Sequence, residues 1–145
     1  MHVSVSLSLS LSVSLPHTPA LPLHQDNVAG IVAAKHCRRN VVTVSVESMD
    51  FHTPVRNANV VSLYAWPTFT SSRSIDIEVA VFVEDIAGQS QTLSNSSHFT
   101  FVSLDEKGRV GALPPLQISG DHEQSAWQRG EARYLARKEE RRKKG

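Results

Sequence analysis

The sequence predicts an α+β domain in which an antiparallel sheet lies across one buried helix. Three observations lead to this fold class. Residues 26–38 are small and apolar, four segments between residues 41 and 104 are rich in β-branched residues and alternate in polarity, and short polar turns separate these segments. A helix followed by strands that can pair as hairpins is typical of α+β proteins.

Residues 26–38 are predicted to form the buried helix. Small side chains such as Ala29 and Ala33 would let it lie close against a sheet, and Arg38 adds positive charge at the C-terminal end, where the helix dipole favours it. Asn40 is a residue type that can end a helix in the left-handed conformation. We expect this helix to be truncated on its N-terminal side.

Four strands are predicted, at residues 41–47, 60–70, 74–84 and 91–104. The third alternates so regularly that one of its faces carries only branched apolar residues, namely Ile75, Ile77, Val79, Val81 and Val83. Pro67 lies inside the second strand. Because proline has no N–H to donate, we expect a bulge or an unpaired edge there. Turns are predicted at residues 49–55, 85–89 and 105–109.

Residues 113–145 are predicted to form a linker and a basic C-terminal helix. Asp121 can cap a helix that runs to about residue 140, and three apolar residues at i, i+7 and i+8 would anchor one of its faces, namely Trp127, Tyr134 and Leu135. The dense charges at residues 137–144 are interpreted as a solvated helix end. A nuclear address or a contact with an anionic surface is the alternative.

Residues 3–15 repeat Ser with Leu or Val in strict alternation. Such alternation is the pattern of a half-buried strand. A secretory signal is a second interpretation, although no basic segment precedes the apolar residues. A third interpretation is that the segment is the translated end of an intron. Introns end in a pyrimidine-rich tract followed by CAG; these residue types can have pyrimidine-rich codons, and Gln25 is compatible with the terminal CAG. We therefore expect residues 1–25 to be a low-complexity segment that is disordered or translated from non-coding sequence.

The composition excludes several classes of protein. A chain of 145 residues, 40% of them hydrophobic, suffices for one domain with a core. A net charge of +1 does not indicate a nucleic-acid partner, and no apolar run approaches the roughly 20 residues that span a bilayer, so no membrane insertion is expected. The single cysteine, Cys37, excludes an intrachain disulfide and fits a cytoplasmic location. With no second cysteine, His36 and Cys37 are expected to pack rather than bind a metal, and no cofactor is predicted.

Several blocks of sequence occur in an order and spacing that resemble a known family. They are VAGIVAAKHC from residue 28, VTVSVESMDFHTPV from residue 42, TFTSSRSIDIEV from residue 68 and FTFVSLDEKGR from residue 99. Together they resemble the cytosolic acyl-CoA thioester hydrolases of the hotdog superfamily. The resemblance implies a long helix wrapped by a curved antiparallel sheet over residues 26–112, and hydrolysis of fatty acyl-CoA to free fatty acid and coenzyme A.

Asp26 lies where that family carries its catalytic aspartate. The resemblance implies that its carboxylate activates a water for attack on the thioester carbonyl or attacks the carbonyl directly. Considered without the family, an aspartate at this point could simply cap the predicted helix. The resemblance also implies that Ser71, Ser72, Arg73 and Ser74 line the CoA cleft, with the arginine on a phosphate. The alternative for these four residues is an ordinary polar hairpin connector.

Two departures from the family bear on activity. Its first strand and the glycine-rich start of its helix have no counterpart in residues 1–25, and losing such carbonyl-polarising N–H groups typically costs about 10²–10³ in rate. The chain also carries one hotdog unit, whereas active sites in relatives form between two. We therefore expect weak activity and poor stability, and two functions stay open: an oligomeric acyl-CoA thioesterase, or a non-catalytic truncated subunit that binds acyl-CoA or only oligomerises.

Overall fold

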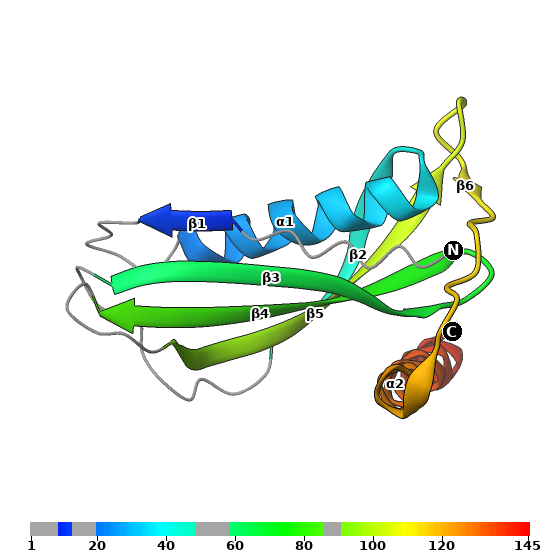
Figure 1. The fold of residues 1–145 in the computed structure, drawn as a ribbon. Coiled ribbons are helices and arrows are strands. Elements are labelled where there is room, and N and C mark those ends of the chain that lie inside the picture. Colours follow the sequence, from blue (N-terminus) through cyan, green and yellow to red (C-terminus); the bar gives the residue numbers. More distant parts are fainter. Residues whose placement is uncertain (1–8, 13–19, 49–58, 86–90) are drawn as a thin grey trace.

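The computed structural model describes residues 9–12, 20–48, 59–85 and 91–145 (Figure 1). Two helices and six strands lie within these ranges: β1 (Leu9–Ser12), α1 (Ala20–Cys37), β2 (Val41–Ser48), β3 (Asn59–Thr70), β4 (Ser74–Asp85), β5 (Thr92–Leu104), β6 (Val110–Gly111) and α2 (Gly120–Lys144). Neither helix is both long enough and apolar enough to cross a membrane. The turn predicted at residues 49–55 falls outside the described ranges, as do residues 86–89 of the turn predicted at 85–89, whose first residue ends β4.

All strands belong to one antiparallel sheet. Its order is β1-β3-β4-β5-β2, and the short β6 pairs with β5. The long strands β3, β4 and β5 form its centre, and α1 lies along the inner face of the sheet, as Figure 1 shows. The predicted α+β class, with one helix wrapped by an antiparallel sheet, is confirmed.

The core lies between α1 and this inner face. From the helix it takes Val28, Ala29, Val32, Ala33 and Cys37, all at most 5% exposed. The opposing residues are the branched side chains predicted for one face of β4, together with Phe99 and Phe101 of β5. Small helical residues lie at this contact: Ala29 and Ala33 are fully buried, and a Cβ at Gly30 would be in ordinary contact with the ring of Phe101, at 3.7 Å.

The predicted strands are confirmed to within one residue at each end. The register between β3 and β4 shifts between Pro67 and Phe69, which is the bulge that the proline required. In the turn after β5, Gly108 takes φ = +76°, and Asp105 accepts hydrogen bonds from two backbone N–H groups of the same turn. The turn predicted at residues 105–109 is therefore confirmed.

The expectation of a missing first strand and a truncated helix is wrong. Leu9–Ser12 pair antiparallel with residues 60–63 of β3 and occupy the sheet edge, because their alternation suits a half-buried strand. The helix begins at Ala20, six residues before its predicted start, and it accommodates Pro22 because the first turn needs no proline N–H. Part of the segment expected to be disordered is therefore strand and helix.

The end of α1 also differs from the prediction. Arg38, not Asn40, takes the left-handed conformation after the helix, with φ = 55°. Its N–H donates to the carbonyl of Ala34 at 2.7 Å, which closes the last turn. An arginine at this position is strained where glycine would not be.

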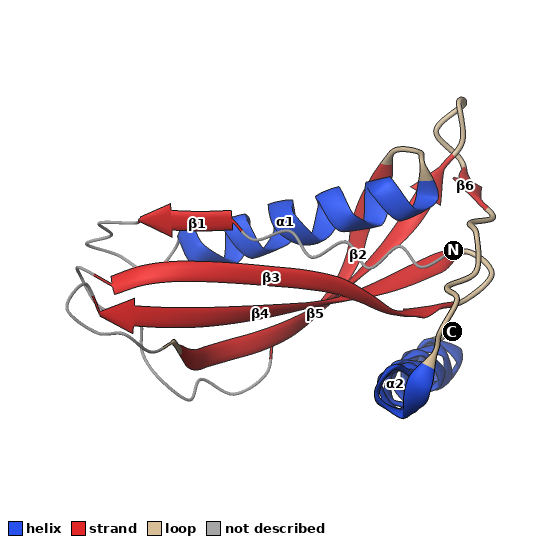
Figure 2. Cartoon of the chain, in the orientation of Figure 1, coloured by secondary structure: helices blue, strands red, loops and turns tan. Residues whose placement is uncertain are grey.

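The C-terminal helix α2 packs on the outer face of the sheet, opposite α1 (Figure 2). The ring of Phe69 on β3 contacts Trp127 and Tyr134, at centroid distances of 5.0 and 5.6 Å. Gly130 is buried beneath them, and a Cβ there would lie 2.5 Å from the Cβ of Phe69. Leu135 was predicted to be a third anchor, but it is 53% exposed, so the packed face is centred on Gly130 instead.

Candidate active site

Asp26 lies inside α1 and faces strand β2. Because the helix begins six residues earlier, Asp26 does not cap it. Its carboxylate is half-buried, and its Oδ1 accepts a hydrogen bond of 2.8 Å from Oγ1 of Thr43. Thr43 pairs with Phe101 on the inner side of the sheet, so strand geometry points its hydroxyl at the helix. The result is a carboxylate held at a defined position beside the sheet edge.

The residue before Asp26 fixes this turn of the helix against the sheet. The amide of Gln25 is buried and donates from Nε2 to Oδ1 of Asn95, at 2.8 Å. Asn95 lies at the register shift between β4 and β5, opposite Val81. A buried hydrogen bond between two amide side chains favours one rotation of α1 about its axis and one position of α1 along the sheet. Sequence reasoning missed it, since neither residue stands out in a pattern.

The sheet edge beside Asp26 is open and apolar. Within the part of the chain that the structure describes, β2 pairs only with β5, and its register shifts between Thr43 and Ser45, as in a β-bulge. Three valines along it are exposed, namely Val42 at 42%, Val44 at 55% and Val46 at 54%. An exposed edge strand with apolar side chains is a surface that pairs readily with another chain.

The structure does not bring the predicted CoA contacts to Asp26. Ser74 pairs with Val102, which pairs with Val42, so it lies two strand spacings from β2, about 10 Å away. Its side chain points to the outer face. The hydroxyls of Ser71 and Ser74 are hydrogen-bonded to each other at 2.6 Å, as in a polar connector. Ser72 and Arg73 are exposed at the tip of the hairpin.

The His36–Cys37 pair packs at the end of α1. Nε2 of His36 lies 2.8 Å from the carbonyl oxygen of Pro114, which ties the helix to the linker before α2. Cys37 is buried; burial raises the pKa of its thiol, and the charge of Arg39 opposes this rise without cancelling it. Among the described residues, no group of three His, Cys, Asp or Glu side chains could hold a metal ion.

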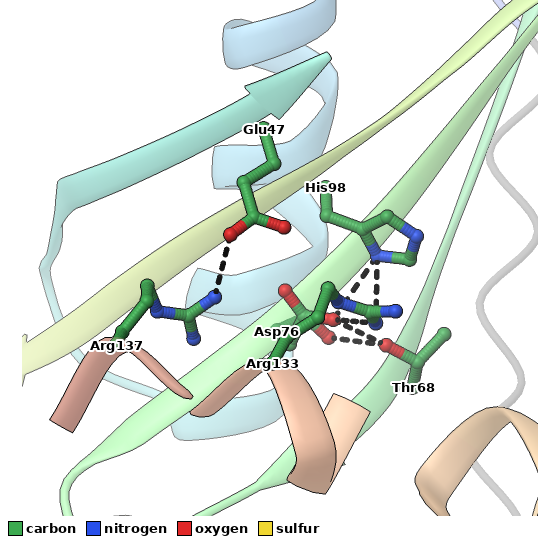
Figure 3. Close-up of polar contacts among 6 residues, drawn as sticks. All are labelled: Glu47, Thr68, Asp76, His98, Arg133 and Arg137. Atoms are coloured by element: carbon green, nitrogen blue, oxygen red, sulfur yellow. Dashed lines mark hydrogen bonds and ion pairs between the residues drawn. The ribbon is translucent and has the colours of Figure 1, made fainter. Parts of the chain in front are cut away.

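A buried polar network joins α2 to the outer face of the sheet, as the close-up in Figure 3 shows. At its centre is Asp76, whose Oδ2 lies 2.7 Å from Nη2 of Arg133 and 3.1 Å from Nδ1 of His98. The hydroxyl of Thr68 donates to the same oxygen at 2.8 Å. Nearer the surface, Arg137 pairs with Glu47 at 3.4 Å.

The environment of Asp76 perturbs its titration. Burial by itself would raise the pKa of this carboxyl, but hydrogen bonds and positive charge from His98 and Arg133 outweigh burial and lower the pKa below its ordinary value of 3.8. Sequence analysis did not single out the network. In the sequence, Asp76 lies between Ile75 and Ile77, so its side chain is on the opposite face of β4, which alternation alone assigns to solvent. The available signal for a buried role was therefore only the acidic residue itself at that position.

These features can be compared with known proteins. A family model described as the thioesterase superfamily matches residues 21–88, which include Asp26 and Thr43. Residues 21–88 belong to the thioesterase superfamily. They contain α1, except its first residue, and strands β2, β3 and β4 of the sheet that wraps this helix, and the resemblance noted in the sequence is thereby confirmed.

Several relatives of this chain are named as acyl-CoA thioester hydrolases. The human cytosolic acyl coenzyme A thioester hydrolase is 40% identical over 118 residues, which cover 80% of this chain and 31% of the human protein. The chain therefore spans about a third of that relative. A solved acyl-CoA hydrolase from Staphylococcus aureus has a TM-score of 0.84 at 24% identity, covering 96% of this chain and 90% of that one. A hexameric thioesterase from Yersinia pestis has a TM-score of 0.64 at 29% identity, over 83% and 100% of the two chains.

Proposed function

We propose that this protein is an acyl-CoA thioester hydrolase in which Asp26 is the catalytic carboxylate. The observation that carries the proposal is the half-buried Asp26 carboxylate, oriented by the Thr43 hydroxyl, inside a thioesterase domain. Relatives named as acyl-CoA thioester hydrolases support the substrate class, and their cytosolic members support a cytoplasmic location. The proposed unit is residues 26–112 with the preceding turns of α1, followed by the linker and α2 in residues 113–145.

The reaction can follow either of two courses at this carboxylate. As a general base, Asp26 removes a proton from water while the water oxygen attacks the thioester carbonyl carbon. The C–S bond then breaks, and the thiolate of coenzyme A takes the proton. As a nucleophile, Asp26 attacks the carbonyl carbon itself and expels the thiolate, and water then hydrolyses the resulting anhydride. Among the described residues, the hydrogen bond to this carboxylate comes from Thr43 and reaches Oδ1, and we assign the catalytic role to Oδ2.

The spacing of Asp26 and Thr43 offers independent support. The S. aureus acyl-CoA hydrolase has been solved with an aspartate replaced by alanine and, separately, with a threonine 17 residues further along replaced by alanine. Asp26 and Thr43 are also separated by 17 residues, and here they are in direct contact. At 24% identity that structure establishes only the fold, so the shared spacing motivates testing the two residues as a pair.

Release of free coenzyme A tests the proposed activity. Incubating the protein with a long-chain acyl-CoA should produce free thiol, measured with a thiol reagent, and fatty acid in equal amounts. In a single turnover in ¹⁸O-labelled water, a general base puts label into the fatty acid. Unlabelled fatty acid with label in Asp26 would identify the nucleophilic course. Binding of acyl-CoA without thiol release would instead favour the non-catalytic subunit.

The proposed active unit contains a second hotdog unit, paired along the open edge of β2. The exposed valines along β2 support this, because a second copy paired along this strand would cover them and close the site at Asp26. Structural neighbours described as hexameric support an oligomer, although not this particular contact. The prediction of CoA contacts at Ser71, Ser72, Arg73 and Ser74 would then concern a cleft lined by two copies.

Charging this edge is expected to dissociate the assembly. The double variant Val44→Lys and Val46→Lys places two cations on each side of a self-pairing edge, so its mass by light scattering should fall to that of a monomer and hydrolysis should fall with it. Leu135→Lys is the matched control, since Leu135 is as exposed, at 53%, but lies on α2. An unchanged mass in the double variant would place the subunit contact elsewhere.

A further inference from the structure

Basic side chains gather at one end of the molecule. The α1–β2 turn, the β3–β4 hairpin and the β5–β6 turn all lie at this end (Figure 1). Backbone hydrogen bonds tie them together, from Leu104 to Asn40 and from Leu113 to Ser72. Between the first and last of these turns is an open recess of about 800 Å³, whose charged lining is Arg38, Arg39, Lys107 and Arg109 with Asp105 and Glu106.

The four cations of this recess are not cancelled by its two acids. One carboxylate oxygen of Asp105 accepts the backbone N–H groups of Lys107 and Arg109, so it is used in building the turn. Its other oxygen lies 3.7 Å from Nε of Arg109, whose side chain stays 70% exposed. These six residues carry a net charge of about +2, and the chain as a whole only +1.

The backbone conformation at Arg38 and the glycine at position 111 both affect how the arginines of this recess are placed. Arg38 occupies the left-handed position after α1, where a glycine would be unstrained, so an arginine is kept at a conformational cost. Arg39 extends over β6: its Nη1 lies 3.3 Å from the point where a Cβ of Gly111 would be. A larger residue in place of Gly111 would crowd that guanidinium.

We infer that this recess binds the phosphate groups at the nucleotide end of the acyl-CoA substrate. The inference rests on the proposed function for the identity of the ligand. Guanidinium groups match phosphate oxygens through paired, charge-assisted hydrogen bonds. The partial negative charge at the C-terminal end of α1 opposes an anion, but four full positive charges exceed it.

The recess lies at a suitable distance from Asp26. Along α1, Asp26 and Arg38 are about 18 Å apart, at 1.5 Å per residue. Along β2, Thr43 is about 10 Å from Asn40 at the rim of the recess. The pantetheine arm between thioester and phosphate equals about four residues of backbone and spans about 15 Å when extended. An acyl-CoA can therefore present its carbonyl to Asp26 while its phosphates reach the four cations.

Calorimetric titration with adenosine 3′,5′-bisphosphate, which contains no thioester, tests the recess on the intact protein. The double variant Arg38→Gly and Arg39→Ala should bind it at least about tenfold more weakly. It should stay folded, because glycine relieves the positive φ at position 38. Lys143→Ala with Lys144→Ala is the matched control: it also removes two exposed cations at the C-terminal end of a helix, here the last two residues of α2, and it should bind like the wild type.

Coenzyme A and 3′-dephospho-coenzyme A extend this test. We expect the wild type to prefer coenzyme A, and the preference to shrink in the Arg38 and Arg39 variant and at high salt. Equal affinity of variant and wild type for the bisphosphate, or no binding by either, would overturn the inference even if the protein hydrolyses acyl-CoA. Cation-dependent binding of the bisphosphate without hydrolysis would uphold the phosphate site and remove the proposed function instead.

Discussion

Replacing Asp26 by asparagine is expected to lower kcat for acyl-CoA hydrolysis by about 10²–10⁴-fold, the usual contribution of a positioned general base. Asparagine has nearly the same shape and can still accept the hydrogen bond from Thr43, so the variant removes the charge and basicity and little else. KM should change little, because the substrate would be held mainly by contacts distant from the carboxylate. The measurement is a steady-state assay of thiol release.

Two further variants show whether the loss is specific. Thr43→Val removes the hydroxyl that orients the carboxylate and should cost about tenfold, consistent with one hydrogen bond. Asp121→Asn makes the same chemical change at an exposed carboxylate in the first turn of α2 and should leave kcat unchanged. Each result is the ratio of a variant's kcat to that of the wild type, so it can be interpreted even if the absolute rate is low. Equal kcat values for wild type and Asp26→Asn would remove Asp26 from the mechanism.

The sheet could be predicted closely from the sequence because its strands carry the information themselves. Alternation of the kind seen from Ile75 to Val83 defines both the strand and its buried face. The bulge followed from the missing N–H of Pro67. Such signals depend on neighbouring residues in the sequence, so the strands could be predicted without knowledge of the tertiary contacts.

The start of the domain could not be predicted in the same way. Residues 9–12 carry a good strand pattern, but the pairing with β3 that uses it is not written in the repeat, since any shift by two residues fits equally well. The candidate site likewise contains one residue that the sequence revealed and one that only the tertiary structure revealed. Asp26 was found through the family resemblance, whereas its partner Thr43 depends on how β2 passes the helix.

The docking of α2 shows a second limit. Apolar spacing correctly singled out Trp127 and Tyr134, yet the position that sets the contact is a glycine, which apolar spacing does not detect. The partner of Arg133 could not be deduced either, because Asp76 is 57 residues away and reads as a solvent-facing residue of an alternating strand. Buried polar contacts of this kind are non-local, and they decide how helix and sheet are joined.

Replacing Asp76 by alanine is expected to lower the free energy of unfolding by about 3–5 kcal/mol, as for other buried ion pairs that lose one partner. The side chain of Asp76 is 2% exposed and that of Arg133 is 21% exposed, so the guanidinium would remain largely buried beside His98 without its counter-charge. Thr68 would lose its acceptor as well. The measurement is reversible urea unfolding of purified variants.

Two comparisons separate charge burial from simple loss of contacts. The double variant Asp76→Ala and Arg133→Met removes both charges and should recover much of the loss, because no uncompensated charge stays buried. Glu47→Gln breaks the neighbouring pair with Arg137; because the carboxylate of Glu47 is 41% exposed, this variant should cost at most about 1 kcal/mol. If Asp76→Ala and Glu47→Gln cost the same, the buried pair does not hold α2 in place.

Acid should reproduce the effect of the substitution. The folded-state pKa of Asp76 lies below its ordinary value of 3.8, so the unfolded chain binds a proton at this group more readily than the folded one does. The stabilisation is therefore fully present above that value and is lost as pH falls through the folded-state pKa. Wild-type stability should fall more steeply than that of the Asp76→Ala and Arg133→Met variant as the pH drops below about 4. Parallel pH profiles for the two proteins would mean that Asp76 is not the group whose ionisation fastens α2 to the sheet.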